Sequence, residues 1–422
     1  MKIGFLVGDI VNISGGSNVI IEHAARLRDR GHDAILIPAH AVELQEPLWH
    51  PRLANLPLVP LSDAARQRFD FVFATWWVTF FDLCRLDSAV YGYLNQSLES
   101  RFHQESHYKL LNRITYSLPL LFVTEARWLE ELIRQLQPNA EVLYVQNGLS
   151  REHFPCVKVP PPHGAPLRVL VEGHWNVGFK GVPETFEILE TVPHDVALEI
   201  GWLTAASGGQ RPRVRGEAVQ VYERLPIDRV RHALQQYDVL LKLSKVEGVF
   251  GPPLEMFSQG GTAITYTVTG SDEYMVHGLN SLLVEPHNRM QIARYLKTLA
   301  TTPGYVSYLR ANALRTARSH PDWEDSTTVL EERLSALHRG GYRNAHVRAP
   351  LGALATLRAP MLEAVWQLEK AARAEPSAAA GERLLLERYR RMKESAPVRA
   401  ARHLLPDALK QSIRNFLSRA SS

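Results

Sequence analysis

The sequence has few cysteines and no long apolar run. Only 2 of its 422 residues are cysteine, Cys84 and Cys156, too few for a disulfide framework or a multi-cysteine zinc site. No stretch of about 18 apolar residues is present, so the sequence predicts no membrane-spanning helix. The chain runs directly into a strand-like segment at 3–7, without the long apolar core of a secretion signal. We therefore expect a cytoplasmic protein.

Excess charge is also scarce, except at the C-terminal end. The chain carries a formal net charge of +4, but the residues from 347 onward hold 14 Lys/Arg against 7 Asp/Glu. This extension is therefore about +7 and the remainder about −3. A nearly neutral body argues against a nucleic-acid binder whose main surface is basic. With 45% hydrophobic and 22% charged residues, the composition is that of a globular protein of two to three domains.

Apolar strand-like runs alternate with helical spacing in two stretches of the chain. The first stretch has strand-like runs at 2–7, 34–38, 69–74, 90–94, 120–124 and 141–145. The second has strand-like runs at 167–172, 197–201, 239–243 and 262–266. Such alternation predicts an α/β protein with parallel sheets covered by helices on both faces.

A proline-rich joint separates the two stretches. Pro155, Pro160–Pro162 and Pro166 favour an extended linker. We expect one Rossmann-like domain over 1–155, a second over 165–340, and a basic helical extension over 347–422. A ligand cleft is expected between the domains, at the carboxyl ends of the strands.

Two glutamates follow the strand-like run at 239–243. Seven residues separate Glu247 from Glu255, and Gly251-Pro252-Pro253 makes a tight turn into a helix between them. Both carboxylates then face the carboxyl edge of the sheet. Ionised carboxylates only accept hydrogen bonds, so the pair suits the vicinal hydroxyls of a sugar. The helix start suits an anion such as diphosphate. Alternatively, two glutamates at this spacing simply lie on solvated faces.

This segment resembles the E-x7-E element of GT-B glycosyltransferases of the retaining, group 1 or family four type, which include sucrose synthases and many bacterial polysaccharide transferases. The resemblance extends over about 1–340. Its further matches are Gly15-Gly16, Asn147-Gly148, Gly270-Ser271-Asp272-Glu273, Gly278-Leu279-Asn280 and Leu282-Leu283-Val284-Glu285-Pro286. It implies a GT-B fold, with two Rossmann-like domains facing across a cleft.

The resemblance also implies roles for particular residues. Glu255 would bind the ribose hydroxyls of the nucleotide, and Glu247 would hold hydroxyls of the donor sugar. Lys180 would neutralise the leaving diphosphate. His174 stands near a position where the family commonly has arginine, so it assists only as a cation or a neutral donor, or is structural. Further donor-binding candidates are Gly15, Gly16, Ser244, Gly251 and Leu254.

Acceptor-side candidates come from the first domain. Trp76 and Trp77 follow one strand, and Gln96 and Glu99 follow the next. Both segments are similar to a rhamnosyltransferase-like branch of the family. A tryptophan can stack on the acceptor sugar or pack in the core. Gln96 and Glu99 either contact a substrate or make local hydrogen bonds.

The expected function is transfer of a sugar from a nucleotide-diphosphate sugar to a saccharide or lipid-linked acceptor, in bacterial surface-polysaccharide or O-antigen synthesis. A non-catalytic nucleotide-sugar-binding scaffold and a nucleotide-sugar epimerase are the alternatives. The chain has no Asp-x-Asp and no His-Glu-x-x-His motif, so we expect neither a metal nor another cofactor. The basic extension, with an apolar stripe through Leu409, Ile413 and Phe416, either docks on an anionic membrane surface or packs on the protein.

Overall fold

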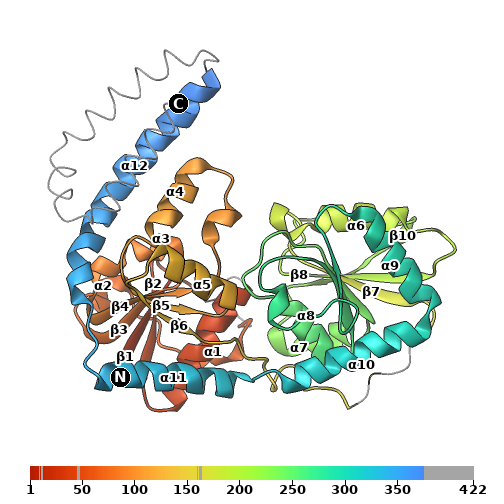
Figure 1. The fold of residues 1–422 in the computed structure, drawn as a ribbon, viewed down its shortest axis with the longest axis horizontal. Coiled ribbons are helices and arrows are strands. Elements are labelled where there is room, and N and C mark those ends of the chain that lie inside the picture. The colour runs from red at the N-terminus through yellow and green to blue at the C-terminus, as the bar shows by residue number, and fades with distance from the viewer. Residues whose placement is uncertain (9, 11–12, 45–47, 159, 161–163, 375–422) are drawn as a thin grey trace.

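The computed structural model describes residues 1–422 except 9, 11–12, 45–47, 159, 161–163 and 375–422. Figure 1 shows two α/β domains side by side, each with strands in the middle and helices outside. Among the described residues, no helix is both long enough and apolar enough to cross a bilayer.

The N-terminal domain is built on a six-stranded parallel sheet of order β2-β1-β3-β4-β5-β6. Its strands are buried on both faces, which explains their nearly unbroken apolar sequences. Its elements are β1 (Lys2–Val7), α1 (Gly15–Asp29), β2 (Asp33–Pro38), η1 (Pro51–Asn55), α2 (Leu61–Ala64), β3 (Arg68–Ala74), α3 (Trp77–Phe80), η2 (Leu83–Arg85), β4 (Asp87–Asn95), η3 (Glu99–Phe102), α4 (Ser106–Ile114), β5 (Leu121–Thr124), α5 (Arg127–Leu136) and β6 (Glu141–Tyr144).

The second domain repeats this architecture with the strand order β11-β8-β7-β12-β13-β14. Strands β7 and β12 pair at the centre, with Leu241 opposite Val171. A small antiparallel hairpin, β9–β10, lies outside the main sheet. The elements are β7 (Leu167–Glu172), η4 (Gly178–Lys180), α6 (Val182–Thr191), β8 (Leu198–Thr204), β9 (Arg213–Val214), β10 (Glu217–Ala218), β11 (Gln220–Glu223), α7 (Ile227–Leu234), β12 (Val239–Lys242), α8 (Pro252–Ser258), β13 (Thr262–Tyr266), η5 (Ser271–Glu273), β14 (Leu282–Val284), α9 (Arg289–Thr301) and α10 (Pro303–Ser319).

After α10 the chain returns to the first domain. Helix α11 (Trp323–Arg339) runs along that domain in Figure 1. Its buried Trp323, Leu330 and Leu334 share a core with residues of β1 and α1. Helix α11 therefore lies within the predicted 165–340 domain in sequence but packs on the N-terminal domain in space.

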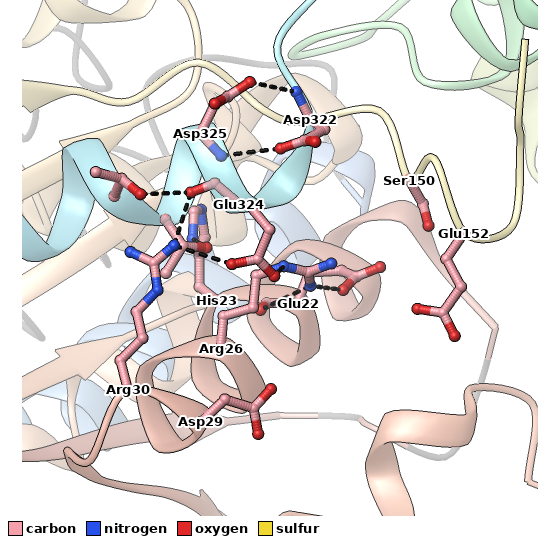
Figure 2. Close-up of polar contacts among 12 residues, drawn as sticks. Glu22, His23, Arg26, Asp29, Arg30, Ser150, Glu152, Asp322, Glu324 and Asp325 are labelled. Carbon is pink, nitrogen blue, oxygen red and sulfur yellow. Dashed lines mark hydrogen bonds and ion pairs between the residues drawn. The ribbon is translucent and has the colours of Figure 1, made fainter.

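Polar contacts join α11 to α1, as Figure 2 shows. The guanidinium of Arg26 lies 2.7 Å from Oε1 of Glu324, and that of Arg30 lies 3.0 Å from Oε2. Asp322 caps α11 by accepting from the N–H of Asp325, which in turn accepts from the N–H of Asp322. This reciprocal capping box begins the helix at the point where the chain crosses back.

The C-terminal extension begins with η6 (Ala345–Val347) and α12 (Arg348–Ala374). Leu351, Leu354 and Leu357 are buried in a core that includes strands β3 to β5. The first part of the extension therefore packs on the N-terminal domain. The apolar stripe through Leu409 and Phe416, on which the membrane prediction depends, lies outside the described residues.

Candidate donor-binding site

The two glutamates occupy the predicted positions at the carboxyl edge of the second sheet. Glu247 lies in the loop after β12, and Glu255 lies in the first turn of α8. Oε1 of Glu247 accepts a hydrogen bond from Nζ of Lys180 at 2.7 Å. Lys180 ends η4, in the loop that follows the neighbouring strand β7. Parallel packing of β7 and β12 thus brings together residues 67 positions apart in the sequence.

Sequence reasoning missed a second lysine in this cluster. Lys242, the last residue of β12, is fully buried, and its Nζ lies 3.5 Å from Oε1 of Glu247. It also donates to Oε2 of Glu172, the last residue of β7. The sequence feature that could have indicated this pair is a charged residue at the end of each of two apolar strands, Glu172 in β7 and Lys242 in β12. Buried charges are retained where they are paired, and here four charged side chains form one network.

The two glutamates differ in proton affinity. Burial opposes the charge of Glu247, but the cations of Lys180 and Lys242 hold its pKa below the ordinary value. Burial raises the pKa of Glu255 to about 7, and the charge of nearby Glu172 adds to the increase. Glu247 is therefore ionised at neutral pH, whereas Glu255 is close to half protonated. Carboxyl groups with perturbed pKa values are typical of functional sites.

The other donor-side candidates lie in the loops after β7 and β12 and in α8. Ser244 is buried beside Glu247 and helps to lower its pKa. Leu254 is buried in the core beneath α8, whereas Gly251 is exposed at its N-cap. Nδ1 of half-buried His174 accepts from the N–H of Asn176 at 3.1 Å, so a neutral ring carries its proton on Nε2. His174 can thus act as the neutral donor that the sequence allowed.

The Gly15-Gly16 segment reaches the same region from the N-terminal domain. Gly15 and Gly16 begin α1, and Ser14 caps the helix by accepting from the N–H of Ser17. Nε2 of Gln96, just after β4, donates to the carbonyl of Gly16 at 3.1 Å. A side chain on Gly248 would meet the Gln96 carbonyl at 1.8 Å. Gln96 therefore connects the glycine loop of one domain to the glutamate loop of the other.

The remaining acceptor-side candidates separate into internal and interdomain residues. The carboxylate of buried Glu99 accepts from the backbone N–H of Trp77 at 2.7 Å and from the Tyr93 hydroxyl at 2.8 Å. Trp77 is itself buried, and its indole donates to His103. Trp77 and Glu99 thus serve the interior of the N-terminal domain.

Trp76 instead belongs to an aromatic row between the domains. Its ring stacks on Phe102, with 6.1 Å between centroids. Phe102 stacks in turn on Phe179, one residue before Lys180, with centroids 5.1 Å apart. Trp76 therefore belongs to the N-terminal domain's part of this aromatic contact, which ends at Phe179 beside Lys180.

Hydrogen bonds also connect the N-terminal domain to the loop that contains Glu247 and Gly248. Arg101 donates to Thr269 Oγ1 at 2.8 Å, and that hydroxyl donates to the Glu247 carbonyl at 3.0 Å. The indole of Trp128 donates to the Gly248 carbonyl at 3.0 Å. The N-terminal domain therefore contacts the Gly248 carbonyl directly through Trp128. It contacts the Glu247 carbonyl indirectly, through Arg101 and Thr269.

Two acidic residues complete the domain contact. Glu273, from the predicted G-x-x-E motif, accepts from the N–H of Arg127 at 2.5 Å and from the Tyr144 hydroxyl at 3.0 Å. Glu125, which sequence reasoning missed, accepts from Nδ2 of Asn147 at 2.6 Å. Burial raises the pKa of Glu125 to about 8.

A separate buried cluster brings together Glu22, His50 and His153, whose ligating atoms lie within 4.8 Å of one another. Arg26 hydrogen-bonds to the Glu22 carboxylate, and Arg52 Nε lies 3.6 Å from it. The backbone N–H of Arg52 donates to Nδ1 of His50. A neutral His50 therefore carries its proton on Nε2, which lies 3.5 Å from Oε1 of Glu22. Two guanidinium groups and this tautomer favour an ion-pair network over a cation site.

Comparison with known proteins identifies the fold. No protein-family model matches the chain, and no curated protein sequence matches it. Solved structures do match, and three of them cover about 80% of this chain and nearly all of their own chains. Sucrose-phosphate synthase from Thermosynechococcus elongatus has a TM-score of 0.64 at 12% identity. Anabaena HepE in complex with UDP and glucose has a TM-score of 0.64 at 15% identity. The lipopolysaccharide outer core galactosyltransferase WaaB has a TM-score of 0.59 at 14% identity.

The fold is GT-B. This confirms the predicted α/β architecture of two parallel sheets with flanking helices. At these identities the likeness concerns the fold, and the candidate residues depend on this chain's own geometry.

Proposed function

We propose that this GT-B protein is a glycosyltransferase that moves a sugar from a nucleotide-diphosphate sugar to a saccharide hydroxyl. The observation that carries the proposal is Glu247, an ionised carboxylate held by two lysines at the carboxyl edge of the central strands. In open α/β sheets, ligands bind at this edge. The HepE complexes with UDP and with UDP-glucose support a nucleotide sugar as the donor, since that protein shares the fold.

The residues divide the donor among them. Glu255, in the first turn of α8, accepts from the ribose hydroxyls. Glu247 accepts from hydroxyls of the donor sugar, and Lys180 moves toward the diphosphate as negative charge develops on it. His174 adds a neutral donor through Nε2. Backbone N–H groups at the start of α1, beside Gly15 and Gly16, offer further donors to an anion.

We further propose that transfer retains the anomeric configuration. The acceptor would attack from the face that the diphosphate leaves, and a departing phosphate oxygen would take the acceptor proton. This reaction needs no enzyme nucleophile and no bound metal, because Lys180 and helix N–H groups supply the positive charge. A hexosyl donor and an acceptor from a bacterial surface polysaccharide, lipid-linked or free, fit this proposal. Membrane contact through the basic extension stays a prediction.

The proposal is tested with a panel of UDP-, GDP- and dTDP-sugars. Thermal shift finds the donor, since a ligand that binds only the folded state stabilises it by RT ln(1 + L/Kd), where L is the free ligand concentration, and product analysis detects transfer. We expect Glu255→Ala to weaken donor binding at least tenfold. Glu247→Ala should lower kcat about 100-fold with a smaller change in binding, because misplacing the sugar slows the chemical step. Activity should persist in EDTA. Glu217→Ala, at an exposed hairpin, is the matched control.

Other outcomes would favour the alternatives. Donor binding without transfer to any acceptor would indicate a scaffold, and conversion of the nucleotide sugar to its epimer would indicate an epimerase. Near-full turnover by Glu247→Ala would refute its assigned role. Magnesium-reversible loss of activity in EDTA would refute the metal-free mechanism.

A further inference from the structure

Lys242 is a buried cation that the proposed chemistry leaves without a role. Its side chain is 1% exposed, against 26% for Lys180. Burial lowers the pKa of a lysine, but the charges of Glu172 and Glu247 more than compensate and raise the pKa of Lys242. A permanent charge therefore lies beneath the candidate site, at the end of a central strand, where it cannot reach a bound substrate itself.

One carboxylate is shared by two lysines of unequal freedom. Oε1 of Glu247 lies 2.7 Å from Lys180 Nζ and 3.5 Å from Lys242 Nζ. Lys180 lies in a short turn at the surface and can reorient. Lys242 is held by the strand backbone and by its bond to Glu172. Of the two lysines, only Lys180 can turn from Glu247 toward a bound ligand.

We propose that Lys242 is a positioning residue that keeps Glu247 ionised and in place when Lys180 turns from Glu247 to the donor diphosphate. This inference rests on the proposed function. In the free protein both lysines neutralise Glu247. In the donor complex Lys180 neutralises phosphate oxygens, and Lys242 is the cation that remains beside the carboxylate that binds the sugar.

The charges around Glu247 make this second lysine necessary. Among the described residues, Glu247 interacts with Lys180, Lys242, Ser244, Glu125 and Tyr274. Glu172 is the ion-pair partner of Lys242. Of these described groups, only the two lysines are cationic. A bound diphosphate adds negative charge, which favours protonation of a buried carboxyl. A protonated Glu247 would lose acceptor capacity toward the sugar.

A purely structural role for Lys242 gives different expectations. In that case its only task is to neutralise Glu172, and removing both charges together should restore normal behaviour. The informative pair is therefore Lys242→Met and the double variant Lys242→Met/Glu172→Gln. The double variant also avoids leaving the half-buried Glu172 carboxylate without its cationic partner, which could impair folding of the single variant.

The first readout is the titration of the Glu247 carboxyl by ¹³C NMR, assigned with Glu247→Gln, with and without UDP. In the wild type we expect the carboxyl to stay ionised across the neutral range in both states. In both Lys242 variants, UDP should raise its midpoint by at least one pH unit, a tenfold change in proton affinity. An unchanged midpoint in the UDP-bound variants would overturn the inference.

The second readout is the pH profile of transfer. The acid limb of kcat should move to higher pH in both variants, because the active form has an ionised Glu247. We expect at least a tenfold loss of kcat at pH 7, partial recovery at pH 9, and a smaller change in donor KM. A wild-type profile in the double variant would show a structural role only. Failure of the wild type to bind any nucleotide would refute the proposed function itself, whereas normal transfer by Lys242→Met would refute only this inference.

Discussion

Buried carboxyl groups in this protein differ in charge because their nearest partners differ. Glu247 faces two ammonium groups and stays ionised. Glu99 receives only two neutral donors, and burial raises its pKa to about 8. Neutral donors satisfy lone pairs but do not offset the cost of removing a charge from water. Side chains of one type are therefore ionised at one position and largely protonated at another.

Glu99 should make stability depend on pH. A group that titrates near pH 8 in the folded state but near its ordinary 4.5 in the unfolded state binds an extra proton when folded. Stability is then highest at acidic pH and falls as the pH rises through this window. Urea unfolding of wild type should therefore show a larger loss between pH 5 and pH 8 than that of Glu99→Gln.

The matched control for this experiment is Glu217→Gln, which changes an exposed carboxyl. Its stability should follow the wild-type profile. Parallel profiles for wild type and Glu99→Gln would contradict the raised proton affinity of Glu99.

At the scale of elements, the two domains are joined by more than the linker. Helices α11 and α12 follow the second domain in sequence, yet both complete the core of the first. A helix becomes stable mainly by burying an apolar face, and α11 and α12 bury theirs against the N-terminal domain. The start of the basic extension is therefore part of the domain core.

We expect Leu354→Ala to destabilise the N-terminal domain by about 2–5 kcal/mol, the range for deleting a buried leucine side chain. Leu354 is 1% exposed in the core beneath α12. Chemical denaturation gives the free energy of unfolding. Thr356→Ala, at an exposed position of the same helix, should change it by no more than about 0.5 kcal/mol. Equal stability of the two variants would show that α12 does not contribute to the core.

For the whole molecule, activity should depend on close approach of the domains at Gly248. The Gln96 carbonyl, the Trp128 indole and the Arg101–Thr269 pair all meet the Glu247–Gly248 backbone. A methyl group on Gly248 would lie 1.8 Å from the Gln96 oxygen. The closed arrangement therefore leaves no space for any side chain.

Gly248→Ala should separate the domains and lower transfer at least tenfold, while donor binding, which depends on the second domain, changes less. Small-angle scattering should report a larger radius of gyration. Gly304→Ala, where an added methyl group meets nothing within 4 Å, should leave the transfer rate and the radius of gyration unchanged. A compact, fully active Gly248→Ala variant would contradict this dependence on closure.

The α/β architecture and the positions of Glu247 and Glu255 could be predicted from local sequence patterns. Buried parallel strands are apolar throughout, so their alternation with helices can be recognised locally. Glu247 and Glu255 are close in sequence, and the turn between them is encoded by adjacent glycine and proline residues. Strand β14 and the short strands β9 to β11 escaped prediction because a few residues carry no distinct period.

The pairing of distant charged side chains could not be predicted in this way, because it depends on which strands are neighbours. Lys242 meets Glu172 because β7 and β12 are neighbours in the sheet, although 70 positions separate them. Glu125 reaches the Gly248 loop from the other domain, and Trp77 and Glu99 are buried within the N-terminal domain. The proton affinity of a carboxyl depends on burial and on charges within a few ångströms. Both are set by the packing of distant segments, which no local pattern records.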